Sequence, residues 1–302
     1  MEPALERGRR CLFIDSLKGL AYSPPTRSLN RTMPNGLTPS VCIDAVLADL
    51  APREALSLVK ESGIGAFEFW GWWDRDLESI EAAKQEFDLS LAACCTKFIS
   101  LVDPATREDY LQGLTESVQA AKQLGCSTLI SQVGDARPQV SREAQRHCLI
   151  EGLQAAGNVL TGSGVNLVIE PLNELVDHAG YYLIRSQEAF DIIEAVNHPQ
   201  IKVVFDIYHQ QISEGHLIRN LTDHIHHIAH FHAAGNPGRH ELTHGEIHYP
   251  SVFEAIQNTA YRGYVGLEYW PTKDPLTGLR EVASWFDRPV ESPLPVNEPS
   301  AP

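Results

Sequence analysis

Short apolar runs alternate with longer amphipathic stretches along most of the chain. The runs have the length of strands, and the stretches repeat their apolar residues at helical spacing. In the stretch 105–124, for example, Tyr110, Leu114, Val118 and Ala121 fall on one helical face. The runs predict eight strands, at residues 40–43, 66–69, 89–94, 128–133, 166–169, 202–205, 228–232 and 265–268.

This alternation, with no second composition regime, favours one closed parallel (β/α)8 barrel. The alternative, an open doubly wound sheet, usually carries a glycine-rich phosphate loop after its first strand. Residues 42–45 contain no glycine, so the barrel is the better prediction. The chain of 302 residues is long enough, because such a barrel needs roughly 250. Gly63, Gly125 and Gly164 follow helical stretches and are expected as C-terminal caps.

Both ends of the chain differ from the segment between them. Residues 1–36 contain Pro, Ser and Asn with weak periodicity, and are predicted as a poorly ordered tail. Met33 is a possible start of the folded protein. Residues 289–302 include five prolines and are predicted as a second tail. The barrel is therefore expected over residues 37–288.

The chain is acidic, with a net charge of −15. Nucleic acids and anionic membranes attract clustered Lys and Arg, so neither is expected as a partner. No apolar run reaches the roughly 18 residues that would suggest a membrane span, and no secretory signal follows the N-terminal arginines. The six cysteines lie mostly in apolar runs without paired spacing, as expected for reduced, buried thiols of a cytoplasmic protein.

Four predicted strands end at, or one residue before, a side chain able to bind a metal. These residues are Glu170, Asp206, His232 and Glu268, separated by 36, 26 and 36 residues. Each step is about one strand–helix unit, so the side chains should converge at the carboxyl end of the barrel, where active sites of this fold lie.

Three carboxylates brought together would repel one another and raise one another's pKa values unless a positive charge lay among them. A divalent cation resolves the conflict. Three carboxylates and one imidazole suit Mn²⁺, Mg²⁺ or Co²⁺ better than a metal that prefers thiolates. The alternative for each residue alone is an ordinary polar side chain at a strand end, but four in phase on successive strands favour the metal site.

Several segments resemble those of the hydroxypyruvate isomerases, which belong to the xylose isomerase-like barrel superfamily together with ketose 3-epimerases and inositol-pathway isomerases. The similarity covers about residues 38–287 and is strongest after Glu170. The segments that carry it are 169–173, 205–209, 234–240, 245–249 and 266–269.

The resemblance implies that Glu170, Asp206, His232 and Glu268 hold the metal ion. It also implies that Glu170 and Glu268 exchange the substrate proton, while His209 and Arg239 contact substrate oxygens. The implied reaction is an aldose–ketose type isomerisation, with hydroxypyruvate and tartronate semialdehyde as the leading pair. A 2-oxo-tetronate isomerase and a ketose 3-epimerase are the alternatives, since histidine at 232 is typical of the epimerases. Relatives also suggest a homo-oligomer acting on a small molecule.

Further residues have two interpretations each. Trp70, in the aromatic loop 70–73, is a candidate pocket wall, or an oligomer contact or simple packing. Lys97 could meet a substrate carboxylate, or be a surface lysine. Glu68 could orient the metal ligands, or be a buried, paired carboxylate. In the histidine-rich segment 224–232, strand alternation is expected to send His226, His230 and His232 to one side, mostly as barrel filling.

Two other functional classes are compatible with the fold. DNA-repair endonucleases share this barrel, but they use more histidines and a basic surface, which the net charge of −15 disfavours. A non-catalytic sugar-binding or scaffold barrel would be expected to lose Glu170 or Glu268, and both are present.

Overall fold

A computed structural model describes residues 36–286 of the chain. The predicted N-terminal tail, residues 1–36, lies outside this range apart from Gly36, and Met33 therefore lies outside it too. The predicted C-terminal tail, residues 289–302, also lies outside it.

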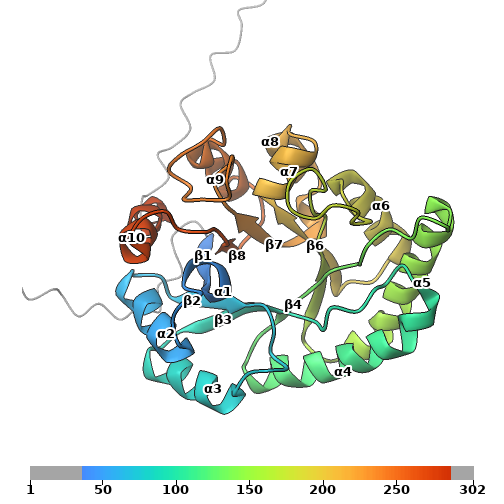
Figure 1. Ribbon diagram of the computed structural model, residues 1–302, viewed down its shortest axis with the longest axis horizontal. Coiled ribbons are helices and arrows are strands. Elements are labelled where there is room, and N and C mark those ends of the chain that lie inside the picture. The colour runs from blue at the N-terminus through green and yellow to red at the C-terminus, as the bar shows by residue number, and fades with distance from the viewer. Residues whose placement is uncertain (1–35, 287–302) are drawn as a thin grey trace, which may run out of the picture. The chain divides into compact units, whose positions relative to one another are not determined.

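The eight strands form one closed parallel barrel in sequence order, and β1 pairs with β8 to close it (Figure 1). The predicted (β/α)8 fold is confirmed. The strands are β1 (Thr38–Cys42), β2 (Ala66–Phe69), β3 (Ser90–Cys95), β4 (Thr128–Ser131), β5 (Asn166–Ile169), β6 (Ile201–Asp206), β7 (Ile228–Ala233) and β8 (Tyr264–Leu267).

Helices surround the ring of strands (Figure 1). Short helices follow β1 and β6 directly, so the chain turns sharply at these strand ends. The α-helices are α1 (Ile43–Val46), α2 (Pro52–Glu61), α3 (Leu77–Glu86), α4 (Arg107–Gln123), α5 (Arg142–Leu160), α6 (Ser186–Val196), α7 (Ile207–Ser213), α8 (Leu217–Asp223), α9 (Tyr249–Gln257) and α10 (Pro275–Phe286), and the 3₁₀ helices are η1 (Pro104–Thr106) and η2 (Ile225–His227).

Side-chain alternation divides the core into two parts. Leu167 and Ile169 of β5 belong to the large apolar cluster that also includes residues of the surrounding helices. Val168 belongs to a small cluster with Val204 and residues of β3 and β4. Successive side chains of a strand point to opposite faces, so Val168 points into the barrel. Continuing this alternation by two residues along the chain sends Glu170 to the inside as well.

The predicted element bounds are close to those observed. The helix expected over 105–124 is α4, preceded by η1, because the Asp103 side chain accepts a hydrogen bond from the Ala105 amide and starts a 3₁₀ turn at Pro104. Gly63 (φ 88°) and Gly125 (φ 67°) follow α2 and α4 in the left-handed conformation expected of caps. Gly164 does not cap a helix, because α5 ends earlier, at Leu160.

None of the helices within residues 36–286 has both the length and the apolar character needed to cross a membrane. Five cysteines lie in this range, and all are buried free thiols, as predicted; they are Cys42, Cys94, Cys95, Cys126 and Cys148.

Candidate active site

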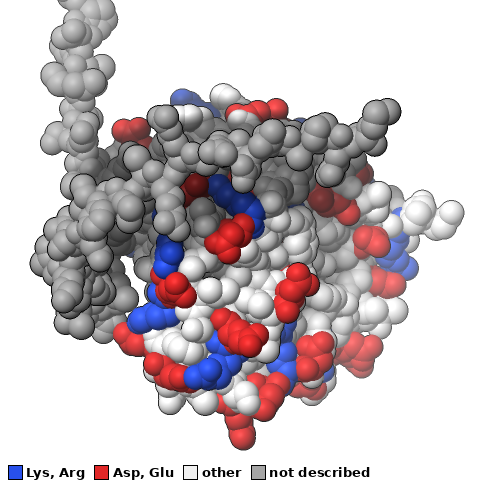
Figure 2. Space-filling view, turned by 60° about the vertical axis from the view of Figure 1, so that its left-hand side comes forward, with Lys and Arg blue, Asp and Glu red and all other residues white. Residues whose placement is uncertain are grey.

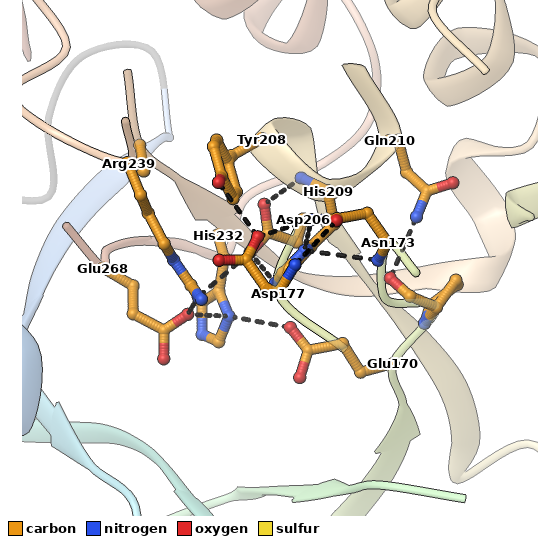
Figure 3. Close-up of polar contacts among 12 residues, drawn as sticks. Glu170, Asn173, Asp177, Asp206, Tyr208, His209, Gln210, His232, Arg239 and Glu268 are labelled. Atoms are coloured by element: carbon orange, nitrogen blue, oxygen red, sulfur yellow. Dashed lines mark hydrogen bonds and ion pairs between the residues drawn. The ribbon is translucent and has the colours of Figure 1, made fainter. Parts of the chain in front are cut away.

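The barrel brings the four predicted ligand residues together at the carboxyl ends of its strands. Asp206 and His232 lie in β6 and β7, and Glu170 and Glu268 follow β5 and β8. Their exposed fractions are only 1% to 6%. One nitrogen or oxygen atom from each of the four lies within 4.8 Å of the others (Figure 3). Such a group of buried ligand atoms can hold a metal ion.

His232 lies between the two glutamates. Its Nδ1 is 3.2 Å from Glu170 Oε1 and 3.5 Å from Glu268 Oε2. Figure 3 shows the two carboxylates on either side of the imidazole ring. The side chains therefore face a common centre from different strands.

Asp206 is the N-cap of α7. Its Oδ1 accepts a hydrogen bond from the His209 amide at 3.0 Å, which is why the helix begins directly after the strand. Its Oδ2 is 3.6 Å from His209 Nε2 and 3.9 Å from Arg239 Nη2. The cap thus fixes one carboxylate oxygen and leaves the other directed at the site.

Glu268 is held by two donors from loops at the same end of the barrel. The Trp70 indole Nε1 donates to Oε1 at 2.6 Å, and Arg239 Nη2 donates to Oε2 at 2.5 Å. Trp70 also packs edge-on against Trp270, with ring centroids 6.0 Å apart. The structure therefore brings Trp70 to the candidate ligand Glu268.

His209 is fully buried and has a defined orientation. The Asn173 side-chain amide lies 2.7 Å from His209 Nδ1. Because an amide NH₂ can only donate, Nδ1 accepts, and the ring proton lies on Nε2, next to Asp206. Burial, followed by the charge of Arg239, lowers the pKa of His209. The neutral ring thus presents an N–H donor to the site.

Asn173, Asp177 and Tyr208 form a supporting network that the sequence analysis did not assign. Asn173 Nδ2 donates to Asp177 Oδ2 at 2.7 Å, and the Tyr208 hydroxyl donates to the same oxygen at 2.9 Å. Asn173 and Tyr208 lie within the motifs that carry the family resemblance, so their proximity to Glu170 and Asp206 was the available signal. The network holds His209 in place.

Arg239 reaches the site from the loop between β7 and α9. It adopts a left-handed backbone conformation, with φ of 56°, and its carbonyl accepts the Trp270 amide at 2.8 Å. The guanidinium lies over the Tyr208 ring, 5.3 Å from the centroid. Its side chain is 13% exposed, so the guanidinium beside Glu268 is mostly buried but retains some contact with solvent.

The two glutamates differ electrostatically. Burial raises the pKa of Glu170 more than His232 lowers it. Burial also acts to raise the pKa of Glu268, but His232 and Arg239 outweigh it and lower that pKa. Opposite shifts on paired carboxylates are typical of acid–base sites.

Lys97 is not brought to this cluster. It forms an ion pair with Glu116 of α4, and its ammonium lies 5.6 Å from the centroid of Trp72. The interpretation of Lys97 as a substrate contact therefore has no support in the structure, and the surface interpretation fits. The other tryptophans of the aromatic loop 70–73 have different contacts from Trp70. Trp72 donates a hydrogen bond to Ser117 at 3.1 Å, and Trp73 packs on Phe98.

The prediction that His226 points into the barrel is wrong. His226 is exposed and lies in η2, before β7 begins at Ile228, so strand alternation does not apply to it. His227 pairs outside the barrel with Glu194 at 3.2 Å. His230 and His232 are in β7 and are buried, as predicted.

The donor set fits a hard divalent cation. Burial raises the pKa of Asp206 although Arg239 and His232 act to lower it, so a further positive charge would stabilise its ionised form. Three oxygen donors and one imidazole nitrogen match Mn²⁺, Mg²⁺ or Co²⁺.

Two curated relatives are isomerases. The chain is 34% identical over 184 residues to the hydroxypyruvate isomerase of Escherichia coli, covering 61% of this chain and 69% of that protein. It is 33% identical over 185 residues to the 2-oxo-tetronate isomerase of Cupriavidus necator, covering 61% and 71%.

A solved structure titled AP endonuclease, family 2, from Brucella melitensis has a TM-score of 0.78 and 26% identity, covering 82% of this chain and 98% of that one. The family described as the xylose isomerase-like TIM barrel matches residues 56–288. The chain belongs to the xylose isomerase-like TIM barrel family.

Proposed function

We propose that the chain is a divalent-metal-dependent isomerase that moves a proton between adjacent carbons of a small keto acid, with hydroxypyruvate and tartronate semialdehyde as the leading pair. The observation that carries this proposal is the placement of Glu170 and Glu268 on either side of His232 within one cluster of buried ligand atoms. The isomerase names of the relatives support the same reaction type.

Glu170, Asp206, His232 and Glu268 would hold the ion, which we expect to be Mn²⁺, Mg²⁺ or Co²⁺. When bound, it would supply positive charge that stabilises the negative oxygen developing during enolisation. We assign Asp206 the holding of the ion, in addition to the cap of α7.

Glu170 and Glu268 are the proposed proton-transfer pair. One carboxylate removes the proton from the carbon next to the carbonyl, and the other delivers a proton to the neighbouring carbon. Their approach to His232 from two sides suits transfer at the two faces of a planar enediolate. Trp70 and Arg239 orient Glu268 through hydrogen bonds to its two oxygens.

Arg239 and His209 are the proposed substrate contacts. The guanidinium can donate two hydrogen bonds to a planar carboxylate, and this favours a keto acid over a neutral ketose. His209 Nε2 can donate to a substrate oxygen. A 2-oxo-tetronate isomerase shares the carboxylate requirement and is the first alternative, while a ketose 3-epimerase would use Arg239 on a hydroxyl.

A nucleic-acid substrate is disfavoured. Figure 2 shows one face of the molecule, and over its described part the basic side chains are interspersed with acidic ones. The net charge is −15, whereas nucleic-acid binding needs a concentrated basic surface.

We also propose that the protein is cytoplasmic, which the free, buried thiols support.

A substrate panel tests the proposed reaction. Enzyme loaded with Mn²⁺ is expected to convert hydroxypyruvate or a four-carbon 2-oxo acid faster than fructose, tagatose or ribulose, because only the acids engage Arg239 through a carboxylate. Product formation is measured by NMR, with chelator-treated enzyme as the control. Preference for the neutral sugars would replace the keto-acid proposal with the epimerase.

We expect the protein to form a homodimer or a higher oligomer. Apolar side chains on loops after β2, β3 and β5 are partly exposed, including Trp73 at 37%, Phe98 at 55% and Leu175 at 75%, and such surfaces are typical of contacts. Light scattering at micromolar concentration should give at least twice the mass of one chain. The mass of a single chain would refute the expectation.

A further inference from the structure

A second group of buried polar residues, Glu68 and His230, lies beside the proposed ligand His232. Glu68 comes from β2 and His230 from β7, and their exposed fractions are 3% and 1%. Neither takes part in the proposed proton transfer. A carboxylate removed from water in this way is costly unless it has a specific partner, so its contacts call for an explanation.

One oxygen of Glu68 faces two histidines. His230 Nε2 is hydrogen-bonded to Glu68 Oε2 at 2.8 Å. His232 Nε2 lies 3.6 Å from the same oxygen and has no hydrogen-bond partner among residues 36–286. The two imidazole rings are nearly perpendicular, with centroids 5.0 Å apart. Glu68 is therefore the carboxylate available to the unpartnered nitrogen of His232.

The neighbouring strand makes room for this arrangement. A Cβ atom built on Gly266 of β8 would lie 1.8 Å from Glu68 Oε1 and 2.7 Å from His232 Cδ2. Any larger residue at 266 would displace the carboxylate or the imidazole. Glycine at this position allows Glu68 to lie against the backbone of β8, next to His232.

The two nitrogens of His232 thus face different groups. Nδ1 faces Glu170 and Glu268, and Nε2 faces Glu68. A neutral imidazole that binds an ion through Nδ1 must carry its proton on Nε2. A carboxylate that accepts a hydrogen bond from this N–H favours the required tautomer and fixes the ring orientation. It also makes Nδ1 a stronger ligand for the ion.

We propose that Glu68 is a positioning residue for the metal site, which selects the Nε2–H tautomer of His232 and is itself held by His230. This inference rests on the proposed metal-dependent function, since His232 must be an ion ligand. It assigns Glu68 the first of the two interpretations that its sequence position allowed. A buried pair that served stability alone would not affect ion binding.

The test is Glu68→Gln, which keeps the size of the side chain but removes its charge. Loss of such a supporting carboxylate should weaken ion binding by roughly 10–100-fold. The dissociation constant for Mn²⁺ is measured on the full, metal-free chain by competition with a fluorescent chelator. In the Mg²⁺-loaded protein, long-range ¹H–¹⁵N spectra of the histidine rings should show His232 as the Nε2–H tautomer in the wild type and altered ring shifts in the variant.

Glu241→Gln is the matched control. Glu241 is also 3% exposed, but it accepts hydrogen bonds from the amide and hydroxyl of Thr272, at 2.9 and 2.8 Å. Its loss should lower the melting temperature and leave the Mn²⁺ dissociation constant and the His232 ring shifts unchanged. A stability effect alone therefore cannot imitate the predicted result.

A folded Glu68→Gln variant that binds Mn²⁺ within about threefold of the wild type, well below the loss expected for a supporting carboxylate, would overturn the proposal. If that variant does not fold, Glu68→Asp decides, because it keeps the charge but moves it away from His232; weaker binding supports the inference and unchanged binding overturns it. Failure of the wild type to bind any divalent ion would instead remove the metal-dependent function itself, and this inference with it.

Discussion

Glu170→Gln and Glu268→Gln should each reduce turnover by roughly 10²–10⁴-fold or more while the fold survives. Glutamine keeps the shape of the side chain and one oxygen that can still contact a metal ion, but it cannot accept a proton. Both glutamates are buried beside His232, so no solvent-exposed group can easily replace them. Turnover is measured at saturating metal, and circular dichroism monitors the fold.

The loss of turnover should be specific to substitution of these two glutamates. Glu241→Gln, at a buried carboxylate whose hydrogen bonds go to Thr272, should keep its turnover. In heavy water, the wild-type product should gain deuterium at the carbon that receives the proton, provided that the catalytic acid exchanges with solvent. Activity above about a tenth of wild type in either glutamine variant would mean that the carboxylates are at most ligands, because loss of a catalytic base has a larger effect.

Asp206→Asn should produce a defect that added metal partly reverses. The aspartate oxygen Oδ1 caps α7, and asparagine caps helices about as well, so the start of the helix should be retained. The variant loses one negative charge from the ion site. We expect the ion affinity to fall on the order of 10²-fold or more, since even supporting residues contribute 10–100-fold.

Titration of turnover against Mn²⁺ distinguishes this defect from those of the glutamates. For Asp206→Asn, the curve should shift to higher Mn²⁺ concentration and recover much of the maximal rate. For Glu170→Gln and Glu268→Gln, the maximal rate itself should stay low, because the missing proton acceptor is not replaced by an ion. A rate for Asp206→Asn that stays low at all Mn²⁺ concentrations would give the aspartate a role in the chemistry.

The barrel and the convergence of the four candidate metal-binding side chains could be predicted from the sequence, because both depend on local, repeating rules. Strand alternation alone sends Val168 and Glu170 to the same side of the chain. The same rule failed at His226, which lies in η2 rather than in a strand. Side chains alternate between two faces only where the backbone is extended, and β7 begins at Ile228 as predicted, so the rule does not reach residue 226.

The sequence by itself determined the eight-strand barrel and which residues end its strands, since both follow from the period of apolar residues and from spacing by one strand–helix unit. Only the tertiary structure decided the partners. Lys97 pairs with Glu116 rather than facing the site, Asn173 orients His209 across 36 residues, and Glu68 meets His230 across 162 residues. These contacts depend on the stagger of distant strands and on loop paths, which no local pattern encodes, and they set the tautomers and charges on which the proposed chemistry depends.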